Sequence, residues 1–570
     1  MSSLYKIVLV LTWLSVSAMA QTVSPFVSGV WCGNVSPTAA SVVVRLTNAG
    51  QRVRLAVSKN AGLGAPAFSP LVTTAAPAGN TLTLTMQGLE PDTDYFYGIE
   101  VAGQLRAEEN SRGRFHTFPL GRGSFKIAFA SCSDYRLTNQ SAFQAILAER
   151  PLLFIHMGDL HYNDTNTTNI EDYRANYDAV LNSPAQSALY RNIPLAYMWD
   201  DHDFCGNDSN GTFAGRDTAR LAYRERTPHY PIAAAGGAVA QSFTVGRVRI
   251  IMTDLRSASS PPDQKETATK TRMGAAQKAW FKQELITARD ANFPLILWVC
   301  TDPWIAAPEL GDDTWAGHAT ERIEIANFIR DNHVTNVVLL CGDMHGLAYD
   351  DGTHSDYATG GGAPLTVLHA ASLTSPGAPK GGPYTGGPIA DSQQFGLLEV
   401  YDTGGPSIAC RFLGVKVGEG TRLSHIFSTA NAASTGDALV NISTLAHLSG
   451  PDDVVVSGFV LSGRGTRAVL VRAAGPALTD FGLNDALLRP KLEVYQGGRL
   501  IATNIGWAPS AEAAATLGDA FDRAGAFQFR DASSRDAALL LNLEPGAYTV
   551  KVSSADKTPG STMLEVYDLR

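Results

Sequence analysis

The sequence lacks a surplus of basic residues, a long apolar segment beyond its first twenty residues, and a cysteine framework. A formal net charge of −9 excludes a surface built to wrap nucleic acid, because such a surface needs a basic face, so no nucleic-acid scaffold is expected as a partner. No later stretch approaches the roughly 18 apolar residues of a membrane-spanning helix. Six cysteines in 570 residues are too few for a disulfide scaffold.

The first twenty residues have the pattern of an export signal. Lys6 precedes an apolar run from Ile7 to Val16, and Ala18-Met19-Ala20 is a cleavage signature. We therefore predict a signal peptide at 1–20 and a secreted or periplasmic protein. No arginine pair precedes the apolar run, so the signal lacks a twin-arginine motif.

The chain is long enough for two to four domains. Residues 24–118 indicate an all-β module, because Val53, Leu55 and Val57 alternate with polar neighbours at the period of a half-buried strand. The stretch from Gly88 to Tyr95 resembles the tyrosine corner of a fibronectin type III sandwich. We expect an N-terminal β-sandwich at 24–118.

Short apolar strands then alternate with amphipathic helices, which indicates an α/β layered domain at 122–417. The expected strands are 125–131, 151–157, 194–199, 247–253, 294–300 and 335–341, and the expected helices are 141–149, 274–289 and 319–332. Residues 418–437 are rich in Gly, Ser, Thr and Ala and are expected to be a linker. Strand patterns return at 438–570, including a hairpin at Gly497-Gly498, so we expect a C-terminal β-sandwich with an accessory role.

Residues able to bind a metal follow several of the predicted strands. Ligands of α/β sheets bind at the carboxyl ends of strands. The strand ends read Ser131-Cys132-Ser133, Gly158-Asp159-Leu160-His161-Tyr162, Trp199-Asp200-Asp201-His202-Asp203, Asp254-Leu255-Arg256 and Gly342-Asp343-Met344-His345. Carboxylates crowded in this way repel one another unless cations hold them. Two metals roughly 3.5–4 Å apart would bind them and would activate a water for hydrolysis.

In these motifs the chain resembles the PhoD-type alkaline phosphatases, a branch of the calcineurin-like metallophosphoesterases. The resemblance covers residues 26–417 and includes Met273-Gly274-x-x-Gln277. It implies a metallophosphoesterase domain with two metals. One metal, typically Fe³⁺, would be bound by Cys132, Asp159, Tyr162 and His345. The second, typically Ca²⁺, would share Asp159 and would add Asp201, Asp343 and Asn207, with Asp208 as the alternative to Asn207.

The ligand types agree with that assignment. A thiolate, a phenolate and an imidazole suit a transition metal, whereas carboxylate and amide oxygens suit calcium. Zn²⁺ is the alternative to Fe³⁺, because a chain exported unfolded must take up its metal outside the cell. The resemblance also assigns catalytic roles to His202, beside the phosphate, and to Arg256, which would contact the phosphate or order the groups around the metals.

The expected function is therefore that of a secreted metal-dependent phosphoesterase that hydrolyses phosphate mono- or diesters with an alkaline optimum. A purple acid phosphatase is an alternative, because Gly158-Asp159-x-x-Tyr162 fits that family too. However, that family places Gly-Asn-His-Glu and Gly-His-x-His where this chain has carboxylates. A further alternative is an inactive surface or adhesive protein, which the two flanking β modules suggest. The sequence leaves the choice between monoesters and diesters open.

Overall fold

The computed structural model describes residues 24–234, 236–430, 441–461, 466–544 and 546–569. The predicted signal peptide lies outside these residues. None of the helices in the described part of the chain has the length and apolar character of a membrane span.

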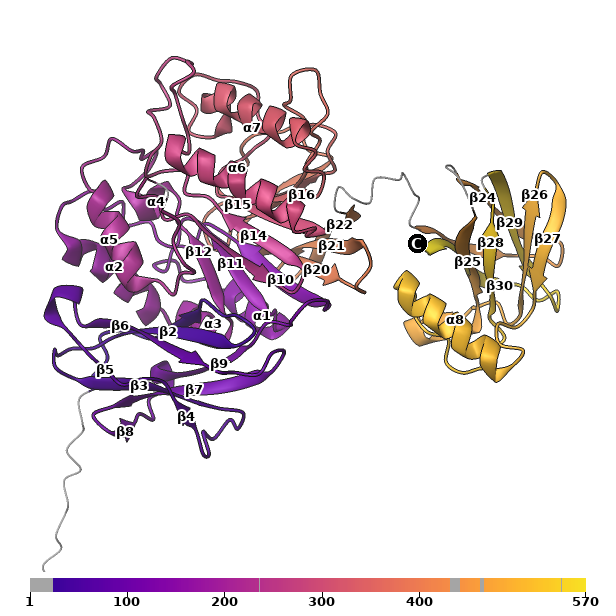
Figure 1. Ribbon diagram of the computed structural model, residues 1–570, viewed down its shortest axis with the longest axis horizontal. Helices are drawn as coiled ribbons and strands as arrows, with labels where there is room; N and C mark the ends of the chain where they lie inside the picture. The colour runs from indigo at the N-terminus through magenta and orange to yellow at the C-terminus, as the bar shows by residue number, and fades with distance from the viewer. Residues whose placement is uncertain (1–23, 235, 431–440, 462–465, 545, 570) are drawn as a thin grey trace, which may run out of the picture.

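Two large sheets form the centre of the molecule (Figure 1). The nine-stranded sheet has the order β22 (Gly420–Ala430), β21 (Ser407–Lys416), β20 (Gln394–Tyr401), β10 (Phe125–Ala130), β11 (Leu153–Met157), β12 (Leu195–Met198), β1 (Trp31–Gly33), β2 (Ala39–Arg45) and β6 (Thr81–Gln87). The seven-stranded sheet has the order β13 (Gln241–Val245), β14 (Val248–Met252), β15 (Leu295–Cys300), β16 (Val337–Cys341), β18 (Thr366–Ala370), β17 (Gly346–Asp350) and β19 (Gly386–Ala390). All six predicted strands are confirmed, and they divide equally between the two sheets as β10–β12 and β14–β16.

The two sheets pack face to face, and the alternation of side chains along the strands shows this. Ile250, Leu297 and Leu340 belong to a core that also contains Ala128 and Phe129 of the nine-stranded sheet. Their chain neighbours Ile251, Trp298 and Leu339 point the other way, into a second core. Side chains of successive strand residues point to opposite faces. Each of these strands is therefore buried on both faces, which explains its continuous apolar sequence.

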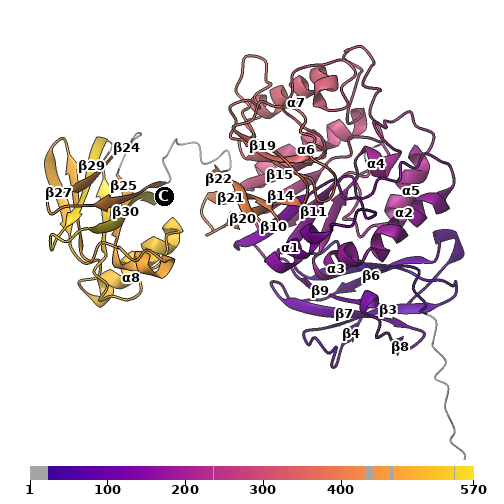
Figure 2. The same ribbon diagram turned by 180° about the vertical axis from the view of Figure 1, so that it is seen from behind.

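Helices cover the outer faces of the sheets. The predicted helices are confirmed as α1 (Ser141–Glu149), α6 (Ala275–Asp290) and α7 (Ala319–Asp331). The second core includes Phe281 of α6 and Ile325 of α7, so these two helices cover the seven-stranded sheet (Figure 1). Figure 2 shows α1 and α3 beside the nine-stranded sheet, from behind. The sequence did not predict four helices: α2 (Ile170–Asn182), α3 (Pro184–Asn192), α4 (Asp201–Phe204) and α5 (Arg216–Arg226).

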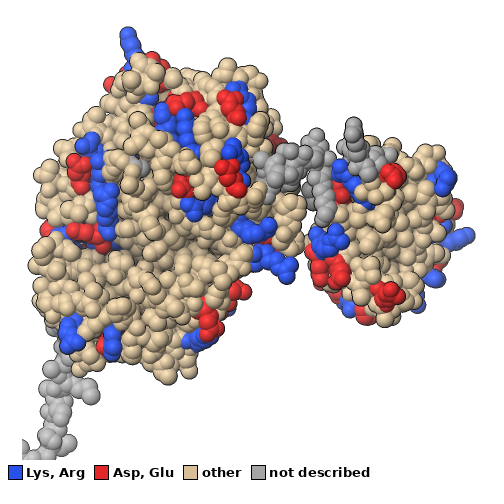
Figure 3. Space-filling view, viewed as in Figure 1, with Lys and Arg blue, Asp and Glu red and all other residues tan. Residues whose placement is uncertain are grey.

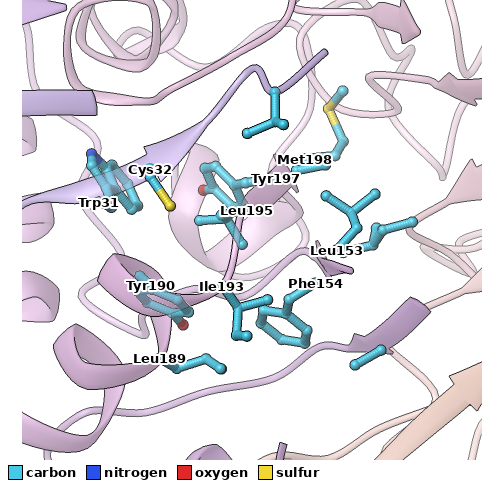
Figure 4. Packing of buried hydrophobic residues seen from close by; sticks show 14 of the residues in the cluster. Trp31, Cys32, Leu153, Phe154, Leu189, Tyr190, Ile193, Leu195, Tyr197 and Met198 are labelled. Carbon is cyan, nitrogen blue, oxygen red and sulfur yellow. The ribbon is translucent and has the colours of Figure 1, made fainter. Parts of the chain in front are cut away.

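The strands of residues 24–118 belong to two sheets. β1, β2 and β6 extend the nine-stranded sheet, because β1 pairs in parallel with β12 at Gly33 and Leu195. β3 (Arg52–Ser58), β7 (Asp94–Val101) and β9 (Arg112–His116) form a separate six-stranded sheet with β4 (Ala67–Phe68), β5 (Val72–Thr73) and β8 (Gln104–Leu105). Figure 4 shows Trp31 and Cys32 of β1 packed with Tyr190, Leu195 and Tyr197. The N-terminal strands and the α/β domain therefore share one core.

The prediction of a linker at 418–437 is wrong for the residues that the structure describes. Gly420–Ala430 forms β22, which pairs with β21 along its length. Leu423, His425 and Phe427 are partly buried and alternate with exposed residues, and this strand pattern outweighs the small and polar residues around it. Residues 431–440 lie outside the described part of the chain.

The C-terminal segment contains two four-stranded antiparallel sheets. One has the order β23 (Asn441–Leu448), β30 (Gly560–Leu569), β25 (Arg467–Ala474) and β28 (Ala537–Leu543). The other has the order β24 (Val454–Leu461), β29 (Gly546–Ser554), β26 (Pro490–Gln496) and β27 (Arg499–Asn504), and the predicted Gly497-Gly498 hairpin joins its last two strands. Helix α8 (Ala511–Ala524), which the sequence did not predict, packs on a separate apolar cluster.

Candidate metal centre

The predicted ligands converge at the carboxyl ends of both central sheets. Cys132, Asp159 and Asp201 follow β10, β11 and β12, which are parallel neighbours. Asp343 and His345 follow β16 of the facing sheet. The side-chain ligand atoms of Cys132, Asp159 and His345 lie within 4.8 Å of one another, as do those of Asp159, Asp201 and His202. Asp159 therefore belongs to both groups.

The backbone at these positions is in the left-handed region. The φ angles are 62° at Cys132, 56° at Asp159, 58° at Asp343 and 52° at His345. Residues other than glycine rarely adopt this conformation, and it gathers at binding and catalytic sites, where the surrounding structure compensates its cost. Each of these residues turns the chain sharply where a strand ends, so its side chain projects beyond the sheet edge.

Tyr162 and His345 complete the first group. The Tyr162 hydroxyl donates a hydrogen bond to Asp159 Oδ2 at 2.9 Å and lies 3.4 Å from His345 Nε2. His345 Nδ1 is 2.9 Å from the carbonyl oxygen of Pro376, which can only accept, so this nitrogen carries the proton. The lone pair of Nε2 therefore faces the other three side chains, as in a metal-binding histidine.

Burial and neighbouring carboxylates raise the pKa values of the acidic groups in this cluster. Burial raises the pKa of Asp159 well above its usual range, and the Asp201 carboxylate raises it further. Burial and the Asp159 carboxylate likewise raise the pKa of the Cys132 thiol. Asp159 Oδ1 is buried and has no hydrogen-bond partner among the described residues. A buried oxygen without a partner is costly, and a cation would supply the missing interaction.

Two further groups of carboxylate oxygens lie nearby, one around Asp201 and one around Asp343. Carboxylate oxygens of Asp201, Asp208 and Asp313 lie within 4.8 Å of one another, and so do those of Asp200, Asp302 and Asp343. The Asp208 N–H donates to Asp201 Oδ2 at 2.7 Å. Asn207, the other candidate, is exposed beside Asp208. The carboxylate at Asp208 thus lies in the acidic cluster, and Asn207 stays a prediction.

His202 lies in the group with Asp159 and Asp201 and is held by a carboxylate that the sequence did not single out. Its Nδ1 is 2.6 Å from Asp164 Oδ1, and its ring packs on Tyr162 with centroids 4.2 Å apart. Burial lowers the pKa of His202, but the carboxylates of Asp159, Asp201 and Asp164 outweigh that effect and raise it to about 9. A protonated imidazole at this position can donate a proton.

Arg256 is fully buried, and all of its guanidinium nitrogens contact carboxylates. Its three guanidinium nitrogens bind Asp200 at 2.5 Å, Asp313 at 2.5 Å and Asp302 at 2.9 Å. The geometry therefore supports the second of its two predicted roles, the ordering of carboxylates around the metals. Asp302 was missed, although it follows β15 as the other acidic residues follow their strands.

Asp254 and Gln277 form a structural support for the same region. Trp199 Nε1 donates to Asp254 Oδ1 at 2.9 Å, and the Asp254 N–H donates to Gln277 Oε1 at 2.8 Å. Asp254 and Gln277 therefore hold the end of β12 against the start of α6, and this structural role explains their presence without a direct part in chemistry.

The loop from Thr374 to Thr385 forms one side of the centre and contains a cation that the sequence analysis missed. Lys380 Nζ lies 2.7 Å and 2.8 Å from the two carboxylate oxygens of Asp343. Burial lowers the pKa of Lys380, but the adjacent Asp343 carboxylate outweighs this effect and raises it. This Pro- and Gly-rich loop has no periodic pattern, so the sequence could not predict that Lys380 lies beside Asp343.

The residues present suit a bound metal pair. The group around Cys132 and His345 offers a thiol, a phenol, an imidazole and a carboxylate, whereas the groups around Asp201 and Asp343 offer carboxylates. Crowded carboxylates of this kind need positive charge to compensate them.

Comparison with known proteins agrees with this geometry. Residues 127–394 match the family model described as PhoD-like phosphatase. This segment is similar to the PhoD-like phosphatases. The PhoD-like domain contains every predicted ligand, from Cys132 to His345.

One curated protein and two solved structures are similar to this chain. Alkaline phosphatase D of Bacillus subtilis (strain 168) is 24% identical over 318 residues, which are 47% of this chain and 54% of that protein's length. The solved structure of PhoD superposes with a TM-score of 0.57 at 19% identity, covering 72% of this chain and 91% of the other. A purple acid phosphatase, PPD1 from yellow lupin seeds, gives a TM-score of 0.46 at 13% identity, covering 71% and 74% of the two chains.

Proposed function

We propose that the chain is a metal-dependent phosphoesterase whose PhoD-like domain binds two cations at the carboxyl ends of the central strands. The observation that carries the proposal is the position of Asp159. Its carboxylate lies in the group with Cys132 and His345 and also in the group with Asp201 and His202, and one of its oxygens has no partner among the described residues. A carboxylate shared in this way is the usual bridge of a two-metal site.

The first cation would be bound by Cys132, Tyr162, His345 and Asp159. The sulfur, phenol and imidazole of this set favour Fe³⁺, with Zn²⁺ as the alternative. The second cation would be bound by Asp159, Asp201 and Asp343, with Asn207 or Asp208, and oxygen ligands favour Ca²⁺. When bound, the two cations would lower the pKa of a water and offset negative charge on the phosphoryl group.

The protein's own groups would divide the remaining work. His202, held by Asp164 and charged at neutral pH, would donate its proton to the oxygen of the leaving group. Arg256 would act as a positioning residue, because its guanidinium fixes Asp200 and Asp302 behind the centre. The proton from His202 would neutralise the negative charge that forms on the leaving oxygen as the ester bond breaks.

The finer features of the protein also belong to this proposal. We infer an alkaline optimum, phosphate mono- or diesters as substrates, and an exported protein. The six-stranded sheet and its neighbours at 24–118 would be the fibronectin III-like module of the prediction, and residues 438–570 an accessory β-sandwich. No predicted ligand lies in either segment.

A turnover assay with metal analysis tests the proposal. The wild-type protein is expected to hydrolyse an aryl phosphate monoester, an aryl diester or both, to lose activity in a calcium-specific chelator, and to regain it with calcium rather than magnesium. Asp159→Asn is expected to reduce kcat at least ~10³-fold while the fold survives, because the bridge between the cations is lost.

Asp263→Asn is the matched control, because it removes one exposed carboxylate of a surface loop. Full activity in excess chelator, or an Asp159→Asn variant within tenfold of wild type, would contradict the two-metal mechanism.

A further inference from the structure

A cavity of about 390 Å³ lies at the sheet edge opposite the metal centre. Its wall includes the segments that precede β10, β11 and β12, whereas the predicted ligands follow those strands. Strand β9 of the six-stranded sheet forms the remaining side. The cavity therefore joins the N-terminal segment to the α/β domain and is separate from the proposed catalytic site.

Three of the arginines that line this cavity have no partner in the described part of the chain. The side chains of Arg114, Arg122 and Arg150 make no hydrogen bond or ion pair with any residue that the structure describes. The fourth cation, Lys126, binds Glu149 at 2.7 Å. Unpaired guanidinium groups gathered around one cavity indicate a site for an anion, because each presents a fork of donors that suits an oxyanion.

The acidic groups of the lining do not cancel this charge. Asp92 and Asp94 both bind His116, at 2.9 Å and 3.0 Å. Burial lowers the pKa of Arg114 and the positive charge of Arg150 lowers it further, while Asp94 opposes this effect. The two arginines are thus close enough to repel each other, and a bound anion would relieve that repulsion.

The other lining groups fit a small, multiply charged oxyanion. Ser124 and Asn192 add neutral donors to the lining, and Phe115, Leu152 and Ile193 add apolar side chains. Apolar walls strengthen the attraction between the arginines and an anion, because they lower the local dielectric. Three guanidinium groups match the charge of a phosphate better than that of a single carboxylate.

We propose that this cavity binds a phosphate oxyanion, held by the arginines that line it, Arg114, Arg122 and Arg150. The phosphate comes either from free inorganic phosphate or from a phosphoryl group along a polyanionic chain. The inference stands apart from the proposed function, because no predicted metal ligand lines the cavity.

Calorimetric titration of the metal-loaded protein tests the site. We expect wild type to bind two inorganic phosphate ions, one of which acts as a competitive inhibitor at the metal centre. The double variant Arg114→Gln, Arg150→Gln is expected to lose the non-inhibitory ion, with affinity at least about tenfold weaker, and to keep the inhibition constant and kcat. The double variant Arg499→Gln, Arg523→Gln removes the same charge elsewhere and should leave both ions bound.

Each outcome is decisive. The proposal is overturned if wild type and the Arg114, Arg150 variant bind the same number of phosphate ions. It is also overturned if the control variant loses the non-inhibitory phosphate as well. If the metal centre binds no phosphate, wild type binds one ion and the variant none, which separates failure of the proposed function from failure of this site. In a parallel titration, tighter binding of long-chain polyphosphate than of inorganic phosphate identifies a polyanionic chain as the source, and equal or weaker binding identifies free phosphate.

Discussion

The ion pair of Lys380 with Asp343 gives the centre a built-in cation. The ammonium group contacts both oxygens of a carboxylate that is proposed to bind the second metal. The ammonium group and a divalent cation cannot both bind closely to the Asp343 oxygens, because two positive charges bound to one carboxylate repel each other strongly. The protein therefore has its own competitor for the second cation.

Lys380→Gln is accordingly expected to bind calcium more tightly, by at least about tenfold. Calorimetric titration of metal-depleted protein measures the change directly. Lys265→Gln, which removes an exposed charge, is the matched control and should leave the affinity unchanged. Weaker calcium binding in Lys380→Gln would show that the lysine organises the site instead of competing for it.

Tyr162 provides a spectroscopic test of the first cation. If its phenol and the Cys132 thiol bind Fe³⁺, the purified protein should be coloured through charge transfer from ligand to metal. Tyr162→Phe removes the hydroxyl that bonds to Asp159 and should shift or weaken the colour and reduce activity. Zinc has a filled d shell and gives no such colour. A colourless and fully active preparation with zinc and no iron would overturn the iron assignment.

The sequence predicted the side chains that follow strands better than those in loops. Cys132, Asp159, Asp201 and Asp343 could be placed at one edge of the fold because an apolar strand marks where each carboxyl end lies, and their role as ligands stays a prediction. Lys380 and Asp164 were missed, since they approach the centre only through long-range folding of irregular segments. Arg256 was identified, but only the structure shows that it is enclosed by carboxylates.

At the scale of elements, the junction from β16 to Asp343 leaves no room for a larger residue. A Cβ atom at Gly342 would lie 2.4 Å from the Met157 carbonyl oxygen and 2.8 Å from that of Thr301. Both contacts are with backbone of neighbouring strand ends, so neither can move cheaply. Glycine here lets the two central sheets approach each other just below the metal centre.

Gly342→Ala is therefore expected to destabilise the protein by about 1–3 kcal/mol and to reduce metal binding, because Asp343 must shift with its neighbour. Denaturant unfolding and calcium titration measure the two effects. Gly405→Ala, where an added Cβ meets nothing within 4 Å, is the control. Equal stability of the two variants would show that the sheet ends can separate without cost.

The elements themselves were predicted unevenly. Strands buried on both faces and long amphipathic helices were recognised from their patterns, whereas α2, α3 and α5 were not. Helix α2 buries polar residues such as Arg174 and Asn176 among its apolar ones. The apolar residues therefore do not recur at the spacing by which an amphipathic helix is recognised in a sequence. Sheet membership of β1, β2 and β6 was missed because strand pattern does not reveal a strand's partner.

At the scale of the whole molecule, the catalytic sheet extends beyond the segment that resembles the family. The family match ends at residue 394, but β20, β21 and β22 occupy residues 394–430 of the nine-stranded sheet. A chain ending at residue 430 is expected to fold and to retain kcat on a small ester, since all ligands precede this point. A chain ending at 394 should be insoluble, because β10 would become an exposed apolar edge.

Circular dichroism, solubility and turnover of the two shortened chains check this expectation. Loss of activity with retained folding in the chain ending at 430 would show that residues 438–570 take part in catalysis. A soluble, active chain ending at 394 would show that the last three strands are dispensable.

The pairing of β10 with β20 also bears on how the protein is made. Phe125 lies opposite Val400, so one neighbour of β10 leaves the ribosome only after nearly all of the PhoD-like domain has been synthesised. β1 must likewise wait for β12. Contacts so distant in sequence make folding slow and leave strand edges open meanwhile. A chain exported as it is synthesised would therefore need protection from aggregation until β20 arrives, and its maturation should depend on chaperones more than its final stability suggests.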